Sequence, residues 1–191
     1  MSAADDFRAL DLRCHKLLAD VPLHDVWVIE LEGGGPGRTM RDVYTVAAQP
    51  SKRPWAVRAL FTLRVVTGRL FRTDTPRHDP ISESYVNRLT DEDRARSLVP
   101  PGTMRGLFRT LYAFTDEALA EARNATVHAF LAMALSPKPG GYRLYWAVYV
   151  KPVGALTSAY MAVIDPFRRY IVYPALIREM QAAWSRTYTS G

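Results

Sequence analysis

The sequence from Asn124 to Val153, "NATVHAFLAMALSPKPGGYRLYWAVYVKPV", decides the fold. Its two halves, 124–135 and 142–153, are rich in β-branched and aromatic side chains, which favour strands. Between them, "SPKPGG" combines prolines with two glycines, as turns do. The stretch therefore predicts two strands joined by a turn. Because both strands are apolar on both faces, at least one further layer or a partner should cover them.

Three more strands are predicted outside this pair. The segments "HDVWVIEL" (24–31) and "LFRTLYAF" (107–114) are again β-branched and aromatic. The segment "EALAEARN" (117–124) favours a helix by propensity alone. However, the turn-forming pair Thr115-Asp116 precedes it, and strands are predicted on either side. We therefore interpret it as one strand of a meander.

Helical periodicity marks most of the remaining chain. Apolar residues recur at three- and four-residue steps in 7–19, in 54–71 and in a long stretch from 156 to 188. Shorter helices are expected at 39–48 and at 91–97, the latter capped by Thr90 or Asp91. In the last helix, Asp165-Pro166 and Pro174 are places where the helix can restart or kink.

This order of elements predicts an α+β fold in which a curved antiparallel sheet wraps around a long C-terminal helix. Residues 1–191 are expected to form a single domain, with residues 1–20 as an N-terminal helical extension. Such packing leaves a space between sheet and helix. If side chains do not fill that space, it becomes a ligand cavity.

Composition narrows the class of protein. The chain has 191 residues, 48% of them hydrophobic, and a net charge of +6. That charge is spread without a Lys/Arg block or a DNA-binding motif, so we expect no nucleic-acid partner. Cys14 is the single cysteine, which excludes an internal disulfide. No secretory signal or apolar run of membrane-spanning length is found, so a soluble, cytoplasmic protein is expected.

The stretch "VWVIELEGGGPGRTMRDV" (26–43) has the strand, glycine loop and helix start of a phosphate-binding loop, but its spacing is wrong. A P-loop needs a glycine five positions before Gly37, where Glu32 stands, and a lysine where Arg38 stands. Pro36 also removes one backbone N–H from the loop. We interpret the glycines as a flexible connection.

Several segments carry a family resemblance: "GTMRGLF", "NATVHAFLAMAL", "YRLYWAVYVKPV" and "YMAVIDPFRR". Over residues 20–187 the chain resembles an uncharacterised bacterial domain-of-unknown-function family related to the START, polyketide-cyclase and birch-pollen-allergen (SRPBCC) superfamily. The resemblance implies a START-like helix-grip domain with a hydrophobic cavity. It implies no cofactor and no catalytic signature, because the fold alone does not fix a reaction.

Candidate ligand-binding residues follow from the strand and helix faces that would meet in this cavity. They are Val127, Leu131, Met133, Leu144, Trp146, Tyr160, Ile164 and Phe167. Arg168 lies next to the helical stripe and would suit an anionic head group at the cavity mouth. Pairing with Asp165 is another possible role, and the favoured alternative for Arg168 is a solvated helix face.

Other candidates are weaker. Strand alternation directs His128 away from the cavity, so we expect it at a surface or interface. No histidine spacing is typical of a metal site, and no metal is predicted. Tyr145 and Tyr149, with Phe130, are expected to form an exposed apolar patch, which would suit a homodimer contact.

Three function hypotheses remain. The first is binding of a small hydrophobic or lipid-like molecule without covalent chemistry. The second is a cyclase- or dehydratase-like enzyme that uses a tyrosine or histidine as general acid or base in the same cavity. The third is an interaction module with a filled interior and the aromatic patch as its working surface.

Overall fold

The computed structural model describes residues 2–49, 83–106, 108–123, 127–152, 161–162 and 165–189. The helix predicted at 54–71 and the start of the last helix, 156–160, lie outside these residues. Among the described residues, six strands form one antiparallel sheet in the order β1-β6-β5-β4-β3-β2. The strands are β1 (Leu23–Glu32), β2 (Met104–Arg105), β3 (Phe108–Ala113), β4 (Glu117–Arg123), β5 (Val127–Lys138) and β6 (Gly141–Pro152).

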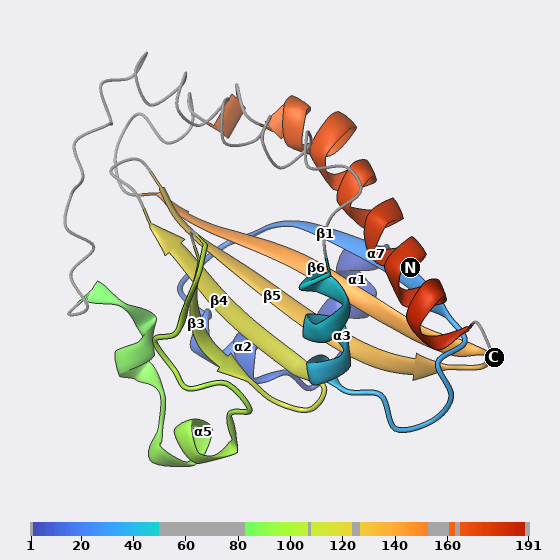
Figure 1. Cartoon of the computed structure of the whole chain (residues 1–191). Coiled ribbons are helices and arrows are strands. Elements are labelled where there is room, and N and C mark those ends of the chain that lie inside the picture. The colour runs from blue at the N-terminus through green and yellow to red at the C-terminus, as the bar shows by residue number, and fades with distance from the viewer. Residues whose placement is uncertain are drawn as a thin grey trace.

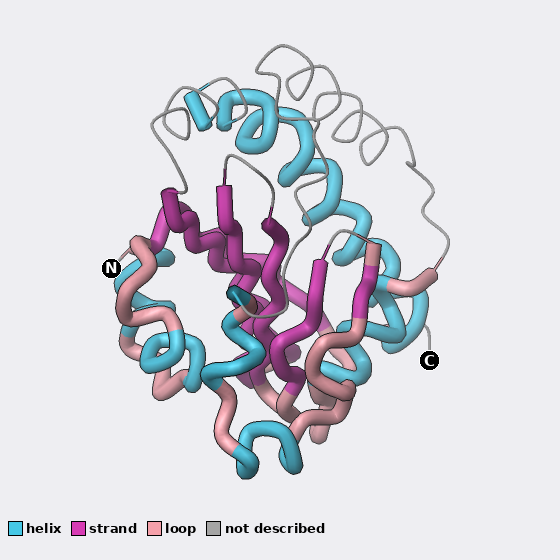
Figure 2. The backbone as a smooth tube through the Cα atoms, turned by 90° about the vertical axis from the view of Figure 1, so that its left-hand side faces the viewer, coloured by secondary structure: helices cyan, strands magenta, loops and turns pink. Residues whose placement is uncertain are grey.

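Helices lie on both sides of this sheet (Figures 1 and 2). They are α1 (Ala3–Arg8), α2 (Arg13–Leu17), α3 (Met40–Ala47), the 3-10 helix η2 (Tyr85–Arg88), α5 (Asp91–Arg96), the π-helical turn η3 (Arg168–Val172) and α7 (Tyr173–Tyr188). The long α7, red in Figure 1, crosses one face and packs on β1, whereas α1 and α2 cover the other. The predicted α+β fold with a C-terminal helix on a curved sheet is confirmed.

The pairing of β5 with β6 has the predicted turn. Partners run from Val127 and Pro152 to Lys138 and Gly141, and Gly140 adopts a φ of 79° in the turn. Gly141 has a second role, because a Cβ there would lie 2.2 Å from the carbonyl oxygen of Leu31. Glycine therefore lets β1 pair along the free edge of β6, which joins the start of the chain to its last strand.

The face toward α1 and α2 is filled with side chains. It is built by Phe130, Ala132, Ala134, Tyr145, Ala147 and Tyr149, all between 0 and 5% exposed. The predicted exposed patch of Phe130, Tyr145 and Tyr149 is therefore wrong. Phe7 of α1 packs against Tyr145, with ring centroids 6.0 Å apart, and the N-terminal helices exclude water from these aromatic rings.

The single helix predicted over 7–19 is also wrong, because α1 ends at Arg8 and α2 begins at Arg13. A buried carboxylate explains the second start. Glu117 of β4 accepts hydrogen bonds from the backbone N–H groups of Arg13 (2.8 Å) and Cys14 (3.4 Å). It thus caps a helix whose own N-cap residue, Leu12, has no capping side chain.

The irregularity expected near Pro174 takes the form of a π-helical turn. The N–H of Tyr173 donates to the carbonyl oxygen of Arg168, five residues back. Proline has no N–H for a bond to the residue four positions earlier, and its ring would crowd that carbonyl group. A wider turn just before Pro174 relieves both problems, and α7 continues to Tyr188.

Candidate functional site

Seven of the nine predicted ligand-binding residues lie on the side of the sheet that faces α7. One hydrophobic cluster there contains Val127, Leu131, Trp146 and Phe167. A second, around Trp184 of α7, contains Met133, Leu144 and Trp146. Arg168 lies at the end of this side, next to β1. Tyr160 and Ile164 lie outside the described residues. The ligand-binding role of all nine remains a prediction.

The described residues cover this helix-facing side only in part. Leu144 is fully buried, but its neighbours Leu131, Met133 and Trp146 are only half-buried, although β5 and β6 are central strands. Register places the small residues Ala118, Ala120 and Ala122 of β4 opposite Met133, Leu131 and Ala129 on the same side. The combination of alanines and half-buried apolar side chains marks a surface that the described chain does not fill.

Two unsatisfied polar groups lie at one end of this surface, on β1. Asp25 is 8% exposed, yet neither carboxylate oxygen accepts a hydrogen bond from the residues that the structure describes, and Arg168 Nη2 lies 3.7 Å away. Burial raises the pKa of Asp25, and the charge of Arg168 opposes this only in part. The indole N–H of Trp27 is likewise buried and has no hydrogen-bond acceptor among the described residues.

Sequence reasoning missed both residues. A signal was available, because Asp25 and Trp27 alternate on one face of a predicted strand that continues with Ile29 and Leu31. A carboxylate on an otherwise apolar strand face is uncommon, and it needs either a partner or a function.

Arg168 connects the C-terminal segment to this end of the sheet. It donates to Asp165 Oδ1 (2.8 Å) and to the hydroxyl oxygen of Tyr173 (2.8 Å from Nε). Asp165 in turn bonds His24 at the start of β1 (2.7 Å). The predicted pairing with Asp165 is confirmed, but the solvated helix face favoured for Arg168 is wrong, since its side chain is 11% exposed.

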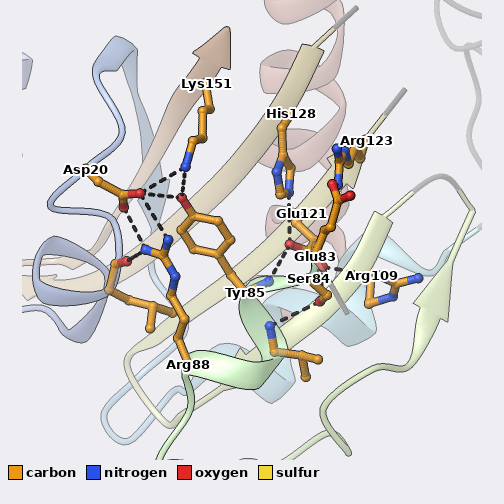
Figure 3. Close-up of polar contacts among 12 residues, drawn as sticks. Asp20, Glu83, Ser84, Tyr85, Arg88, Arg109, Glu121, Arg123, His128 and Lys151 are labelled. Carbon is orange, nitrogen blue, oxygen red and sulfur yellow. Dashed lines mark hydrogen bonds and ion pairs between the residues drawn. The ribbon is translucent and has the colours of Figure 1, made fainter. Parts of the chain in front are cut away.

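A polar pocket of about 420 Å³ lies at the opposite side of the sheet. Figure 3 shows the polar contacts among the side chains around it. The pocket is lined by Glu83, Ser84, Tyr85, Asn87, Arg88, Arg123, His128, Lys151 and Pro152. His128 points away from the helix-facing side, as strand alternation predicts. The expectation that it lies at a surface is wrong, because it is 4% exposed beneath the pocket and stacks on Phe130.

Glu121 of β4 organises the base of this pocket (Figure 3). Its carboxylate accepts hydrogen bonds from Ser84 Oγ, from the backbone N–H of Tyr85 (3.1 Å) and from His128 Nε2 (3.0 Å). Burial alone would raise the pKa of Glu121, but these hydrogen bonds outweigh burial and the pKa lies below its ordinary value. Serine contacts the carboxylate and not the imidazole, so this is no nucleophilic triad.

A second network closes the pocket wall. The Tyr85 hydroxyl donates to Asp20 Oδ2 (2.8 Å) and accepts from Lys151 Nζ (2.9 Å). Arg88 pairs with Asp20 at 2.7 Å and its guanidinium lies 3.6 Å from the centre of the Tyr85 ring. Through these contacts the two cations and the one carboxylate hold η2 against β6 and against the segment that follows α2.

Within the described ranges, no three His, Cys, Asp or Glu side chains are placed to hold a metal ion. In the same part of the chain, no helix combines the length and the apolar character needed to cross a bilayer.

The fold defines an α+β protein with a long helix on one side of an antiparallel sheet. The chain belongs to the family DUF2867, described as proteins of unknown function, whose model matches residues 17–175. No curated protein matches the sequence. Among solved structures, an uncharacterized protein from Rhizobium leguminosarum matches 87% of this chain and 98% of its own, with 11% identity and a TM-score of 0.32. The family membership agrees with the domain-of-unknown-function resemblance, and the relation to the START-like superfamily remains a prediction.

Proposed function

We propose that the protein binds a small hydrophobic or lipid-like molecule between the sheet and its C-terminal helix. The observation that carries this proposal is the row of half-buried apolar side chains on central strands, Leu131, Met133 and Trp146 with Ala129. Central strands of a well-packed domain bury such residues fully, as the opposite face does here. Covering this surface with a ligand would gain about 25 cal/mol per Å² of apolar area.

The polar groups at the end of this surface support a more specific ligand. Asp25 offers a carboxylate acceptor and Trp27 an indole N–H donor, and within the described part of the chain both are buried without a hydrogen-bond partner. A buried unpaired polar group costs free energy that a ligand can recover by hydrogen bonding to it. A head group that both donates and accepts, such as a hydroxyl or an amide, fits this pair. A carboxylate head group would be repelled by Asp25.

A START-like relationship, implied by the sequence resemblance, is consistent with this proposal. Proteins of that architecture are expected to enclose a hydrophobic cavity between sheet and C-terminal helix. The π-helical turn of Arg168–Val172 lies over the same end of the sheet as Asp25. Such turns frequently occur at functional sites.

Ligand binding is tested with two long-chain probes that share one tail, an alcohol and a fatty acid, both brominated on the tail. Bromine near Trp27 or Trp146 should quench tryptophan fluorescence, and the alcohol should bind more tightly. Ala129→Phe fills the surface and should weaken binding by about tenfold or more, since a bulky side chain takes the ligand's place. Ala95→Phe on the exposed face of α5 is the matched control.

Native mass spectrometry of the purified protein gives a second readout. A co-purified apolar compound, lost in Ala129→Phe and kept in Ala95→Phe, supports the proposal. Absence of quenching by both probes, together with a ligand-free mass for the wild-type protein, would refute it.

A second candidate function is proton transfer on the bound molecule, as in a cyclase- or dehydratase-like enzyme. It is favoured by the raised pKa of Asp25 beside the Arg168–Tyr173 pair, because a desolvated carboxylate is a stronger base than an exposed one. Extracts of wild type and Asp25→Asn separate the two candidates. An enzyme predicts two compounds of different mass, substrate in the variant and product in the wild type, whereas a binding protein predicts the same compound in both.

The third hypothesis, an interaction module, loses its basis. The aromatic patch on which it depends is covered by α1 and α2.

A further inference from the structure

The polar pocket on the other side of the sheet has an unequal distribution of charge. Arg88 of η2, Arg123 of β4 and Lys151 of β6 all line it, together with His128 of β5. Of the described residues in its lining, Glu83 alone is acidic. The carboxylates of Asp20 and Glu121 lie behind the lining and bond its members from outside.

The carboxylates do not balance these cations. Asp20 is shared between Arg88 (2.7 Å) and Lys151 (3.0 Å), so that one negative charge serves two positive ones. Glu83 pairs with Arg123. Behind the lining, Glu121 pairs with Arg109 at 3.3 Å. Among the described residues, four cations therefore share three carboxylates, which leaves one positive charge before His128 is counted. Low-dielectric walls concentrate such a field inside a concave site.

The pairing of Arg123 with Glu83 marks where a ligand would enter. The Glu83 side chain is 54% exposed at the rim, whereas the Arg123 side chain is only 20% exposed. An exposed carboxylate on an ion pair is held weakly and exchanges with solvent. The guanidinium fork binds carboxylate or phosphate oxygens with two parallel hydrogen bonds, so a ligand anion can replace Glu83 in the same geometry.

The base of the pocket is preorganised. Glu121 is 2% exposed, and four groups bond it, including Arg109 Nη1 at 3.3 Å. It fixes the His128 ring through Nε2. Within the described chain, the second ring nitrogen, Nδ1, makes no hydrogen bond, and His128 lines the pocket. A ligand that reached this nitrogen would find the ring already held in place, and the rigid support lowers the cost of ordering it.

We propose that this pocket is a second binding site, which takes a small organic anion carrying a carboxylate or phosphate group. Arg123 binds the anionic group, Lys151 and Arg88 supply the surrounding field, and His128 Nδ1 contacts the ligand from below. The volume of about 420 Å³ lies within the range of small-molecule sites. The site is separate from the helix-facing surface and does not depend on the function proposed for that surface.

Calorimetric titration with succinate and with inorganic phosphate, each at low ionic strength, tests the proposal and distinguishes the two anion chemistries. Saturable binding of either probe is expected for the wild type. Arg123→Met should weaken it by about tenfold, the usual loss for one charge-assisted contact. Arg143→Met is the matched control, because Arg143 also lies on a strand and pairs with a single glutamate, Glu30 at 2.9 Å, outside the pocket lining.

If Arg123→Met folds poorly, anion binding to a second variant, Glu83→Gln, tests the proposal instead. Removing the competing carboxylate should tighten binding several-fold, whereas a purely structural role for the Arg123–Glu83 pair predicts no gain. Thermal unfolding of each variant shows that it is folded. Absence of saturable binding of both probes to wild type and Glu83→Gln would overturn the proposal. Equal affinities for Arg123→Met and Arg143→Met would do the same.

Discussion

The two faces of the sheet come from the same strands but differ in how they are covered. The face toward α1 and α2 carries rings and alanines that are at most 5% exposed, and its buried glutamates are fully hydrogen-bonded. The face toward α7 keeps half-buried apolar residues and an aspartate to which no described residue donates a hydrogen bond. The difference teaches that strand alternation provides two apolar faces, while the covering helices determine how completely each face is buried.

The largest expected effect comes from a matched pair of leucines, one on each face. Leu119 of β4 is 0% exposed on the face toward α1 and α2, and Leu131 of β5 is half-buried on the other. Leu119→Ala should lower the free energy of unfolding by about 2–5 kcal/mol, because it leaves a closed cavity. Leu131→Ala should cost only about 1 kcal/mol.

Urea unfolding followed by circular dichroism measures both values. Equal losses of unfolding free energy for the two variants would mean that both faces of the sheet are packed alike, which would contradict the difference described above.

Two aspartates, one on each side of the sheet, are expected to change the free energy of unfolding in opposite directions when they are replaced by asparagine. Asp93 of α5 bonds Arg13 of α2 at 2.8 Å, and this hydrogen bond lowers the pKa of Asp93 from 3.8 to about 2. Its folded pKa is below its unfolded one, so it stabilises the protein above pH 3.8, and this contribution is lost as the pH falls toward 2. Asp93→Asn should therefore cost about 2 kcal/mol at pH 7.

The measurement is the free energy of unfolding between pH 7 and pH 2. Asp91→Asn, at the exposed start of the same helix, is the control. If Asp93→Asn lost stability on acidification as steeply as the wild type, the assignment to Asp93 would be incorrect.

The smallest effect is expected at Asp25, on the side facing α7. Burial raises the pKa of Asp25 in the folded protein above its unfolded value, so its charge destabilises the fold at neutral pH, and the cost disappears as the pH falls through the folded pKa. Asp25→Asn should therefore raise the free energy of unfolding by about 1 kcal/mol at pH 7. Asp11→Asn, at an exposed position, is the control.

Thermal unfolding of ligand-free protein at pH 7 gives the answer. A loss of stability in Asp25→Asn would show that the Arg168 ion pair outweighs the cost of burying Asp25.

Much of the sheet could be predicted from the sequence, because period-two alternation and turn residues are local signals. Even the ambiguous segment 117–124 is a strand, β4, as its flanking turns indicated. The break between α1 and α2 could not be predicted, since the carboxylate that caps α2 comes from Glu117, about a hundred residues away. The same holds for the aromatic patch, because nothing local in Tyr145 or Tyr149 indicates that α1 packs over them.

For the candidate sites, strand alternation predicted that the apolar ligand-binding candidates share the face toward α7 and that His128 lies on the opposite face. It did not identify the polar pocket, because Tyr85, Glu121 and Lys151 are distant in sequence and meet only through the fold. Asp25 and Trp27 could have been identified from the strand pattern, but they belong to no known sequence motif.

The sequence by itself determined which residues share a strand face, where the chain turns, and that a long helix follows the last strand. These properties depend on residues within a few positions of one another, so a short stretch of sequence is enough to predict them. Only the tertiary structure decided which face is sealed, which carboxylates are paired and where the basic side chains gather. Burial and ion pairing depend on contacts between distant segments, and no local pattern encodes those.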